Sequence, residues 1–348
     1  MKYSLIIPVF NRPDEVDELL ESLTRQSIRD FEVIVVEDGS QVRCEDVVQR
    51  YAGQLDVHYY PKENSGPGPS RNYGAERSKG EYLIILDSDV VLPEGYLQAV
   101  DEELTAQPCD AFGGPDRAHE RFTTMQKAIN YSMTSFFTTG GIRGSRKKKL
   151  DKFYPRSFNM GIRRDLYRKL NGFSAMRFGE DIDLSIRIFK SGARVRLFPE
   201  AWVWHKRRTD LRKFFRQVHN SGIARINLYK KYPESLKWVH LLPALFTIGL
   251  FILLGLFVAG LLLLCLPGMQ QTGIVLCILS CLPVLLYKLV ILVDAGIRNH
   301  SLKVGLVSVP AAFVQLTGYG TGFLRAWWLR CVCGRNEELQ AFRQTFYK

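Results

Sequence analysis

The cysteines of this sequence give no indication of a disulfide framework. Its seven cysteines are an odd number, no Cys-x-x-Cys pair occurs, and three of them lie within apolar stretches. With 348 residues, 46% hydrophobic and 24% charged, the chain is also too long and too apolar for a small disulfide-stapled module or a disordered tail. We therefore expect cores built by burial of apolar side chains, in a reducing compartment.

The first residues do not match the pattern of a secretory signal peptide either. The apolar run at the N-terminus ends at Asn11, and Arg12 and Asp14 follow at once. A cleavable leader needs a longer apolar stretch than this. We expect the first part of the chain to remain in the cytosol.

Acidic residues are outnumbered by basic ones. The chain has 35 Asp and Glu against 47 Lys and Arg, which gives a formal net charge of +12. Such an excess indicates an anionic partner, and composition leaves three kinds open: nucleic acid, a phosphorylated substrate, or acidic lipid headgroups.

Charge also disappears from three stretches near the C-terminus. Residues 241–266 contain no charged side chain, and 26 residues are enough to cross a bilayer core of roughly 30 Å. Residues 272–293 contain only Lys288, which is close enough to the end to snorkel. Residues 304–324 are uncharged, but Pro310 and four glycines interrupt them. We predict a membrane region over residues 236–325.

The topology of this region follows from the basic residues around it. Two spans return the chain to the starting side, where Arg298 and Lys303 then lie, whereas a third span would export a basic tail over residues 326–348. We therefore predict two spans, a third segment that is re-entrant, interfacial or packed against protein, and a cytosolic tail.

Strand and helix patterns alternate over the first part of the chain. Apolar runs at residues 3–9, 31–36, 57–60 and 82–86 predict strands, and helices are expected between them. Near-continuous apolar strands that alternate with helices are typical of an α/β fold with a parallel sheet covered on both faces. In such sheets, ligands bind beyond the carboxyl ends of the strands.

Polar residues follow several of these strands. Asn11 follows the first, residues 37–40 (Glu-Asp-Gly-Ser) close the second, and residues 87–89 (Asp-Ser-Asp) end the fourth. Asp87 and Asp89 emerge on the same side of the sheet edge and suit Mg²⁺ or Mn²⁺. An isolated Asp-x-Asp is more often a turn with a helix-capping Asp, but its place beyond a parallel strand favours a metal site.

A Gly- and Pro-rich loop, residues 64–72, opens the third predicted helix. It offers Arg71 and backbone N–H groups to an anion. It is neither a P-loop nor a Gly-x-Gly-x-x-Gly after the first strand, which argues against ATPases and dinucleotide oxidoreductases.

Three candidate features lie later in the chain. Glu180 and Asp181 begin a predicted helix, where the helix dipole favours acids in any protein. His205 ends a short strand and could bind a metal, although a lone histidine is more often structural. Residues 206–231 hold nine basic residues and one acid in an amphipathic pattern. This helix either lies on an anionic leaflet or packs on the preceding domain with its basic face in solvent.

Residues 1 to about 235 resemble a family 2 glycosyltransferase of the GT-A fold. The resemblance rests on six motifs in order: residues 8–11 (Pro-Val-Phe-Asn), 37–40, 64–72, 87–89, 159–161 (Asn-Met-Gly) and 179–181 (Gly-Glu-Asp). Each motif is modest, but their order and spacing together are specific. The family implies inverting transfer of a sugar from a nucleotide-diphosphate sugar to a hydroxyl, with Mg²⁺ or Mn²⁺.

The resemblance also implies roles for individual residues. Asp89 would bind the metal and Asp87 would contact the ribose or sugar, while Asp87 and His205 remain candidate metal ligands on the grounds of residue type and position. Asp181 aligns with the catalytic base, and Glu180 would assist acceptor binding. The donor would be bound by Pro8, Phe10, Asn11, Asp38, Arg71, Asp87 and Ser88.

The chain departs from the family in two places. Glu37 replaces the first Asp of the common Asp-Asp-Gly-Ser motif, which leaves Asp38 as the better-supported contact. The Gln-x-x-Arg-Trp motif of processive synthases is absent, since residues 217–220 read Gln-Val-His-Asn. We therefore expect one sugar to be transferred per encounter.

The predicted function is that of a multi-pass enzyme of the cytoplasmic (inner) membrane with its catalytic domain in the cytosol. It would contact anionic lipids and build a cell-surface glycan on a glycan or lipid-linked acceptor. One alternative is transfer to polyprenyl phosphate. Another is an inactive scaffold. A membrane-attached nucleic-acid-binding protein is disfavoured, because the basic segments contain no helix-turn-helix, zinc-ligand or aromatic-rich RNA-binding pattern. We therefore expect no nucleic-acid partner.

Overall fold

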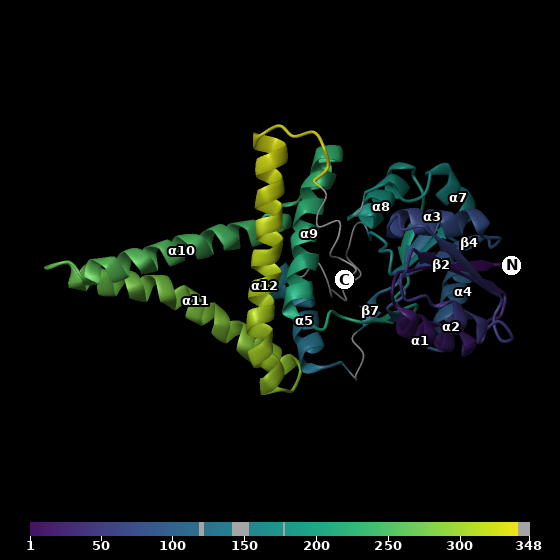
Figure 1. The fold of residues 1–348 in the computed structure, drawn as a ribbon, viewed down its shortest axis with the longest axis horizontal. Coiled ribbons are helices and arrows are strands. Elements are labelled where there is room, and N and C mark those ends of the chain that lie inside the picture. The colour runs from purple at the N-terminus through teal and green to yellow at the C-terminus, as the bar shows by residue number, and fades with distance from the viewer. Residues whose placement is uncertain (118–121, 141–152, 177, 340–348) are drawn as a thin grey trace. The chain divides into compact units, whose positions relative to one another are not determined.

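The computed structural model describes residues 1–117, 122–140, 153–176 and 178–339 (Figure 1). The chain divides into two compact units. The sheet unit comprises residues 1–120 and 147–206, and the helical unit comprises residues 121–146 and 207–346. The boundary differs from the one expected near residue 235, because the basic helix after residue 206 packs within the helical unit.

The sheet unit is built on seven strands in the order β3-β2-β1-β4-β8-β6-β9. Strands β1 to β4 are parallel, β8 is antiparallel to both β4 and β6, and β9 is parallel to β6. Their bounds are β1 Tyr3–Val9, β2 Phe31–Asp38, β3 Val57–Lys62, β4 Tyr82–Leu86, β6 Ala111–Gly113, β8 Asn159–Arg163 and β9 Val195–Leu197. The expected α/β fold with a mostly parallel sheet is confirmed.

Helices cover both faces of this sheet (Figure 1). Successive side chains of a strand point to opposite faces. In β1, Leu5 and Ile7 therefore join the core on one side, whereas Ile6 joins the core on the other. The first side is covered by α1 (Pro13–Thr24), α2 (Glu45–Gln49) and α4 (Tyr96–Ala106), and the second by α3 (Pro67–Arg77), α7 (Arg164–Lys169) and α8 (Glu180–Lys190).

A second, three-stranded sheet brings a late segment of the chain beside the end of β4. It contains β5 (Val90–Val91), β10 (Val203–His205) and β7 (Asp116–Arg117). His205 pairs with Val90 in this sheet. The imidazole thus lies next to the Asp-Ser-Asp motif, although 115 residues separate His205 from Val90 in the sequence.

The helical unit contains one long basic helix and three long apolar helices. Its elements are α5 (Thr124–Thr134), α6 (Phe136–Thr139), α9 (Leu211–Lys231), η1 (Pro233–Ser235), η2 (Trp238–His240), α10 (Leu242–Leu264), α11 (Gln270–Arg298), α12 (Leu302–Trp327) and the π-helical turn η3 (Trp328–Val332). Part of the expected C-terminal tail is therefore helical, and residues 340–348 lie outside the described residues.

Helix α9 packs closely on α12, and glycines permit the approach. A Cβ atom added to Gly222 of α9 would lie 2.2 Å from the carbonyl oxygen of Tyr319. A Cβ atom added to Gly322 of α12 would lie 2.0 Å from the carbonyl oxygen of His219. Apolar side chains of α9, including Phe214 and Val218, share a core with α5 and α12. Neither interpretation of the basic helix anticipated this partner.

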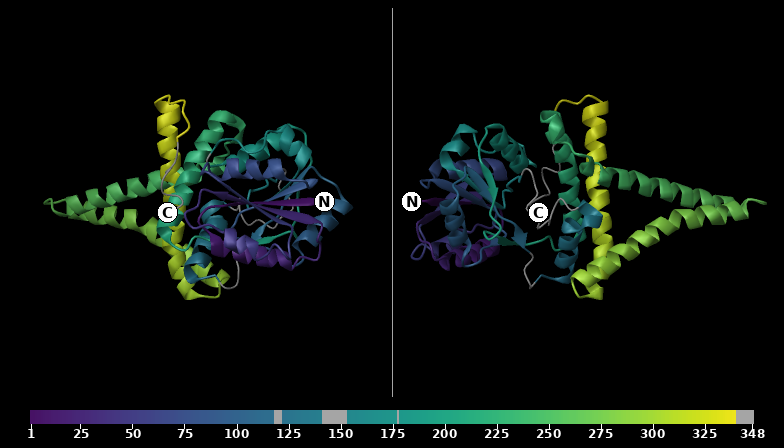
Figure 2. Two further views of the ribbon diagram at one scale, coloured as in Figure 1. Left: turned by 45° about the vertical axis from the view of Figure 1, so that its right-hand side comes forward. Right: turned by 180° about the vertical axis from the view of Figure 1, so that it is seen from behind.

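Within the described residues, three helices are long and apolar enough to cross a membrane: Trp238–Leu264, Gln270–Arg298 and Leu302–Val332. Their most apolar windows have mean hydropathies of 2.7, 2.6 and 1.2, and 11%, 11% and 44% of each window is buried, respectively. Helices α10 and α11 form a hairpin that extends away from α12 (Figure 2). Helix α12 runs across the end of the hairpin that is opposite to the α10–α11 connection. The exposed apolar surface of α10 and α11 indicates association with lipid.

The third helix is continuous through Pro310 and its glycines. A re-entrant segment would turn back on itself, so that prediction is wrong. Of the two remaining expectations, an interfacial segment and one packed against protein, the second agrees with the greater burial of this helix and with its contact with α9.

Candidate active site

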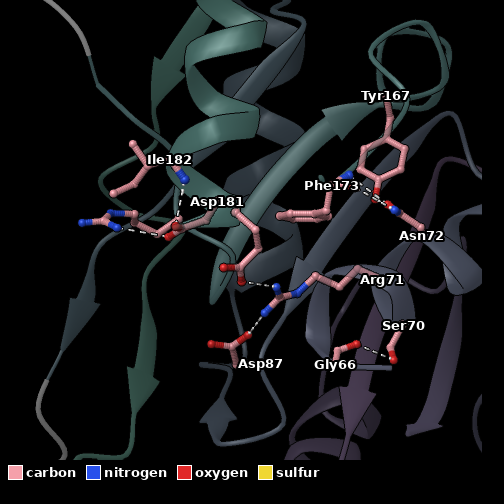
Figure 3. Close-up of polar contacts among 11 residues, drawn as sticks. Gly66, Ser70, Arg71, Asn72, Asp87, Tyr167, Phe173, Asp181 and Ile182 are labelled. Atoms are coloured by element: carbon pink, nitrogen blue, oxygen red, sulfur yellow. Dashed lines mark hydrogen bonds and ion pairs between the residues drawn. The ribbon is translucent and has the colours of Figure 1, made fainter. Parts of the chain in front are cut away.

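One buried arginine joins three elements of the sheet unit. Arg71 of α3 has a side chain that is only 4% exposed. It donates hydrogen bonds of 2.7 Å to Asp87 Oδ1 and 2.9 Å to Glu180 Oε1 (Figure 3). The ring centroid of Phe173 lies 5.0 Å from its guanidinium carbon. The end of β4, the start of α3 and the start of α8 therefore converge on one guanidinium.

Charge and burial compete at this cluster. Burial opposes the charge of Arg71, but Asp87 and Glu180 raise the arginine pKa, so the guanidinium stays charged. Burial raises the pKa of Glu180 to about 7, with attraction to Arg71 opposing the shift and the charge of Asp181 adding to it. Perturbed carboxyl groups of this kind are typical of functional sites.

Asp181 lies beside Glu180 in the first turn of α8. Its Oδ1 accepts a hydrogen bond from the backbone N–H of Ile182 at 2.8 Å, and its Oδ2 pairs with Arg156 at 3.1 Å (Figure 3). The side chain is 15% exposed. Asp181 is therefore held in one orientation by the helix N-terminus and by a cation, with part of its surface accessible.

A second cluster surrounds Asp89. Its Oδ2 accepts a hydrogen bond from Arg12 at 2.7 Å, and its Oδ1 lies 3.2 Å from His205 Nε2. One ligand atom from each of Asp87, Asp89 and His205 can be chosen so that all three lie within 4.8 Å of one another. Among the described residues, the buried Nδ1 of His205 has no hydrogen-bond partner. Two carboxylates and an imidazole at this spacing fit a divalent cation.

Asp38 shapes the loop that leads into α3. Its Oδ1 accepts hydrogen bonds from Lys62 Nζ at 2.7 Å and from the backbone N–H of Ser65 at 2.9 Å. Its Oδ2 accepts a hydrogen bond from the N–H of Gly66 at 2.8 Å. The carboxylate thus positions the residues just before Arg71, and its contact with a nucleoside stays a prediction.

Asn11 adopts the left-handed conformation, with φ of 52°, directly after β1. Its Oδ1 accepts hydrogen bonds from the N–H groups of Gln41 and Val42, and its own N–H donates to Ser40 Oγ. Asn11 therefore joins the loops that follow β1 and β2.

The remaining predicted donor contacts lie at the same edge of the sheet. Pro8 is near the end of β1, Phe10 follows that strand, and Ser88 is buried between the two aspartates. Their binding of a donor stays a prediction. The departure from the family motif has a structural explanation, because Glu37 Oε2 accepts the backbone N–H of Cys44 at 2.7 Å.

The sequence did not single out two arginines of the site, Arg12 and Arg156. Arg12 could have been found, since it follows Asn11 at the carboxyl end of a predicted strand. Asn159, in one of the motifs that carry the resemblance, accepts a hydrogen bond from Tyr96 Oη at 2.6 Å and donates one to the Ala201 carbonyl at 2.8 Å, so its side chain links parts of the fold. Arg156 lies in a stretch without clear periodicity, and no local signal distinguished it from the other basic residues there.

Comparison with known proteins agrees with this architecture. A relative from Haemophilus influenzae, described as an uncharacterized glycosyltransferase, is 31% identical over 195 residues, covering 54% of this chain and 62% of the relative. The uncharacterized glycosyltransferase EpsJ of Bacillus subtilis is 25% identical over 206 residues, covering 57% of this chain and 58% of the relative. The chain thus spans less than two thirds of either relative.

A solved structure shares the fold. A mannosyltransferase from Pyrobaculum calidifontis, in complex with GDP-Man and Mn²⁺, has a TM-score of 0.57 at 14% identity, over 94% of this chain and 88% of that chain. The family model described as glycosyl transferase family 2 matches residues 4–170. Residues 4–170 of this chain are thus similar to glycosyl transferase family 2, the family that the sequence motifs resemble.

Proposed function

We propose that this protein transfers a sugar, with inversion, from a nucleotide-diphosphate sugar to a hydroxyl acceptor. The observation that carries the proposal is the bridge from Arg71 to Asp87 and Glu180. It links Asp87, at the expected donor edge of the sheet, to Glu180, one of the two expected acceptor acids. The family match over residues 4–170 supports the reaction class.

In this reaction, Asp181 accepts the proton of the acceptor hydroxyl as its oxygen bonds to the anomeric carbon. The bond from that carbon to the phosphate oxygen breaks at the same time, and the nucleoside diphosphate leaves from the opposite face. One displacement inverts the centre, so the enzyme needs no nucleophile of its own. Arg156 and the N–H of Ile182 keep the Asp181 carboxylate oriented for this step.

Asp87, Asp89 and His205 would hold a divalent cation, Mg²⁺ or Mn²⁺, which as a Lewis acid stabilises the charge on the departing diphosphate. Arg12 and Arg71 each engage one oxygen of these aspartates. The two arginines therefore restrict how the carboxylates can rotate and keep them close together.

We infer that the acceptor is lipid-linked and that the enzyme lies at the cytoplasmic membrane with the sheet unit in the cytosol. The exposed apolar helices α10 and α11 support membrane association. Exposed basic residues on α9, such as Arg212, Lys213 and Lys230, suit anionic headgroups. Synthesis of a cell-surface glycan follows from such an acceptor.

Direct transfer to polyprenyl phosphate is a second candidate, which the Arg156 contact favours. A guanidinium beside the base could bind an acceptor phosphate, whose oxyanion attacks without losing a proton. Asp181→Asn would then retain transfer to polyprenyl phosphate. If transfer to hydroxyl acceptors is the reaction, the same variant loses activity on all acceptors.

The test is a donor screen on membranes that contain the full chain, with and without EDTA, which measures released nucleoside diphosphate. Asp89→Ala and Asp181→Ala should each lower acceptor-dependent release by at least about a hundredfold, the scale of acid–base catalysis. Asp165→Ala is the control, since this exposed acid contacts its sequence neighbours Arg163 and Leu166. Full activity of both site variants would disprove the assignment. Tight, salt-sensitive binding of nucleic acid without any release would favour the nucleic-acid alternative.

A further inference from the structure

We propose a second divalent-cation site, formed by Glu32, Asp56 and His58, at the amino ends of β2 and β3. Glu32 is the second residue of β2, and Asp56 and His58 flank the start of β3. One ligand atom from each residue can be chosen so that all lie within 4.8 Å of one another. Because the strands are parallel, this cluster lies at the edge of the sheet opposite to Asp38 and Asp87.

The buried carboxylate of Glu32 points to this site. Its side chain is 0% exposed. Oε1 accepts hydrogen bonds from Ser4 Oγ and from the backbone N–H of Lys79, both at 2.6 Å. Within the described part of the chain, Oε2 accepts no hydrogen bond and lies 3.7 Å from His58 Nε2. A buried carboxylate oxygen without a donor is costly, and a bound cation removes that cost.

The imidazole of His58 faces the same point. Its Nε2 lies 3.1 Å from Asp56 Oδ1 and, in the described residues, makes no hydrogen bond of acceptable geometry. His58 Nε2 therefore lies near one carboxylate oxygen of Glu32 and one of Asp56. An imidazole with two carboxylates is a type of ligand set that binds Zn²⁺ and related transition metals, so Zn²⁺ is a suitable probe for this site.

The surroundings hold the ligands in place. Ser4 Oγ donates to Glu32 and accepts from the N–H of Gly80, so the carboxylate is bound to β1 and to the turn after α3. The backbone carbonyl of Asp56 accepts the N–H of Val33 at 2.8 Å. A cation here would join β2, β3 and this turn, and we expect it to stabilise the sheet unit without taking part in transfer.

The test uses the full chain in detergent, stripped of metal, with Zn²⁺ as the probe. Asp89→Asn is introduced first, so that the set of Asp87, Asp89 and His205 does not compete. We expect this variant to bind one zinc ion by calorimetry and to melt at a higher temperature with zinc. Adding His58→Gln should weaken that binding at least tenfold and abolish the shift in melting temperature.

Matched variants distinguish the loss of a zinc ligand from the general effect of substituting a residue. His300→Asn removes a histidine from the turn between α11 and α12 and should leave zinc binding unchanged. Asp56→Asn provides a second, exposed ligand variant if His58→Gln folds poorly, and it should also weaken binding. The proposal is wrong if Asp89→Asn binds no zinc, as expected for an imidazolium simply paired with two carboxylates. It is equally wrong if the ligand variants bind zinc as tightly as their parent.

Discussion

At the scale of single residues, Arg71 is the contact on which the geometry of the proposed site most depends. It is charged, 4% exposed and bonded to two acids. A lysine keeps the charge but cannot reach both carboxylates in the same plane. Removing an arginine from such a buried arrangement leaves at least one acid without its partner, which is strongly destabilising.

We therefore predict that Arg71→Lys lowers sugar transfer by at least about tenfold, or 1.4 kcal/mol in the activation barrier. The rate of nucleoside diphosphate release at saturating donor measures this. Arg77→Lys is the control, because Arg77 lies on the same helix but stacks on the Tyr73 ring, 3.4 Å from its centroid. Equal activity of the two variants would contradict the role given to Arg71.

Glu180 should make stability depend on pH. Its pKa rises from 4.5 to about 7 on folding, mainly through burial, so the folded protein holds a proton that the unfolded chain releases between these values. The resulting stabilisation is complete below pH 4.5 and is lost as the pH rises through 7. It amounts to a few kcal/mol, at about 1.4 kcal/mol per unit of pKa.

We predict that Glu180→Gln flattens this part of the profile. The melting temperature of the wild type should fall relative to Glu180→Gln between pH 5 and 8, as measured by thermal unfolding of the full chain in detergent. Glu102→Gln, an exposed acid on α4, should follow the wild type. A wild type that gains stability over this range, relative to Glu180→Gln, would show that the Arg71 ion pair outweighs burial.

The acids of the site could be predicted from the sequence because each follows a strongly apolar strand or begins a helix. Asp38, Asp87 and Asp89 are local features of that kind. Their basic partners could not be predicted in the same way. Arg156 precedes β8 and meets Asp181 at the start of α8, so their contact depends on how two separate elements pack in the fold.

At the scale of elements, the packing of α9 on α12 depends on glycine. We predict that Gly222→Ala destabilises the helical unit by about 1–3 kcal/mol, the usual cost of overpacking. Its Cβ would lie 2.2 Å from a backbone oxygen, which cannot rotate away as a side chain can. Thermal unfolding in detergent measures the change.

Gly249→Ala in α10 is the matched control for this substitution. Among the described residues, nothing lies within 4 Å of its added Cβ. Alanine there should be neutral or stabilise the helix by up to about 1 kcal/mol. If both variants unfold at the same temperature, the α9–α12 contact is looser than described.

The parallel strands could be predicted within a few residues, because a strand buried on both faces reads as a continuous apolar run. Strands β6 and β8 were missed, since one has three residues and the other begins with Asn159 and ends with Arg163. The basic pattern of residues 206–231 predicted a helix. Its partner was not predictable, because α12 and its Gly322 lie about a hundred residues after Gly222 of α9.

At the scale of the whole molecule, the α10–α11 hairpin and α12 indicate which helices cross the membrane. The connection at residues 265–269 is uncharged, whereas Lys237 and Arg298 lie at the other end of the hairpin. Helix α12 is less apolar, more buried and transverse to the hairpin (Figure 2). We therefore expect the hairpin to cross the membrane and α12 to remain on the basic side.

Two exposed cysteines can report this topology. In intact cells that express single-cysteine variants of the protein, a membrane-impermeant maleimide should label Cys265, at the hairpin connection. Cys333, after α12, should be labelled only after permeabilisation. Labelling of Cys333 in intact cells would mean that α12 also spans, and protection of Cys265 would mean that the hairpin does not cross.

The interleaved path of the chain also limits how this protein can be divided. Residues 121–146 leave the sheet unit and contribute α5 to the helical unit before the chain returns for β8. A fragment truncated at residue 206 keeps α5 but loses α9 and α12, which cover Ala128, Ile129 and Met133. Such a fragment should aggregate on expression. A soluble catalytic fragment would instead end at residue 206 and also lack residues 121–146, with a short linker in their place.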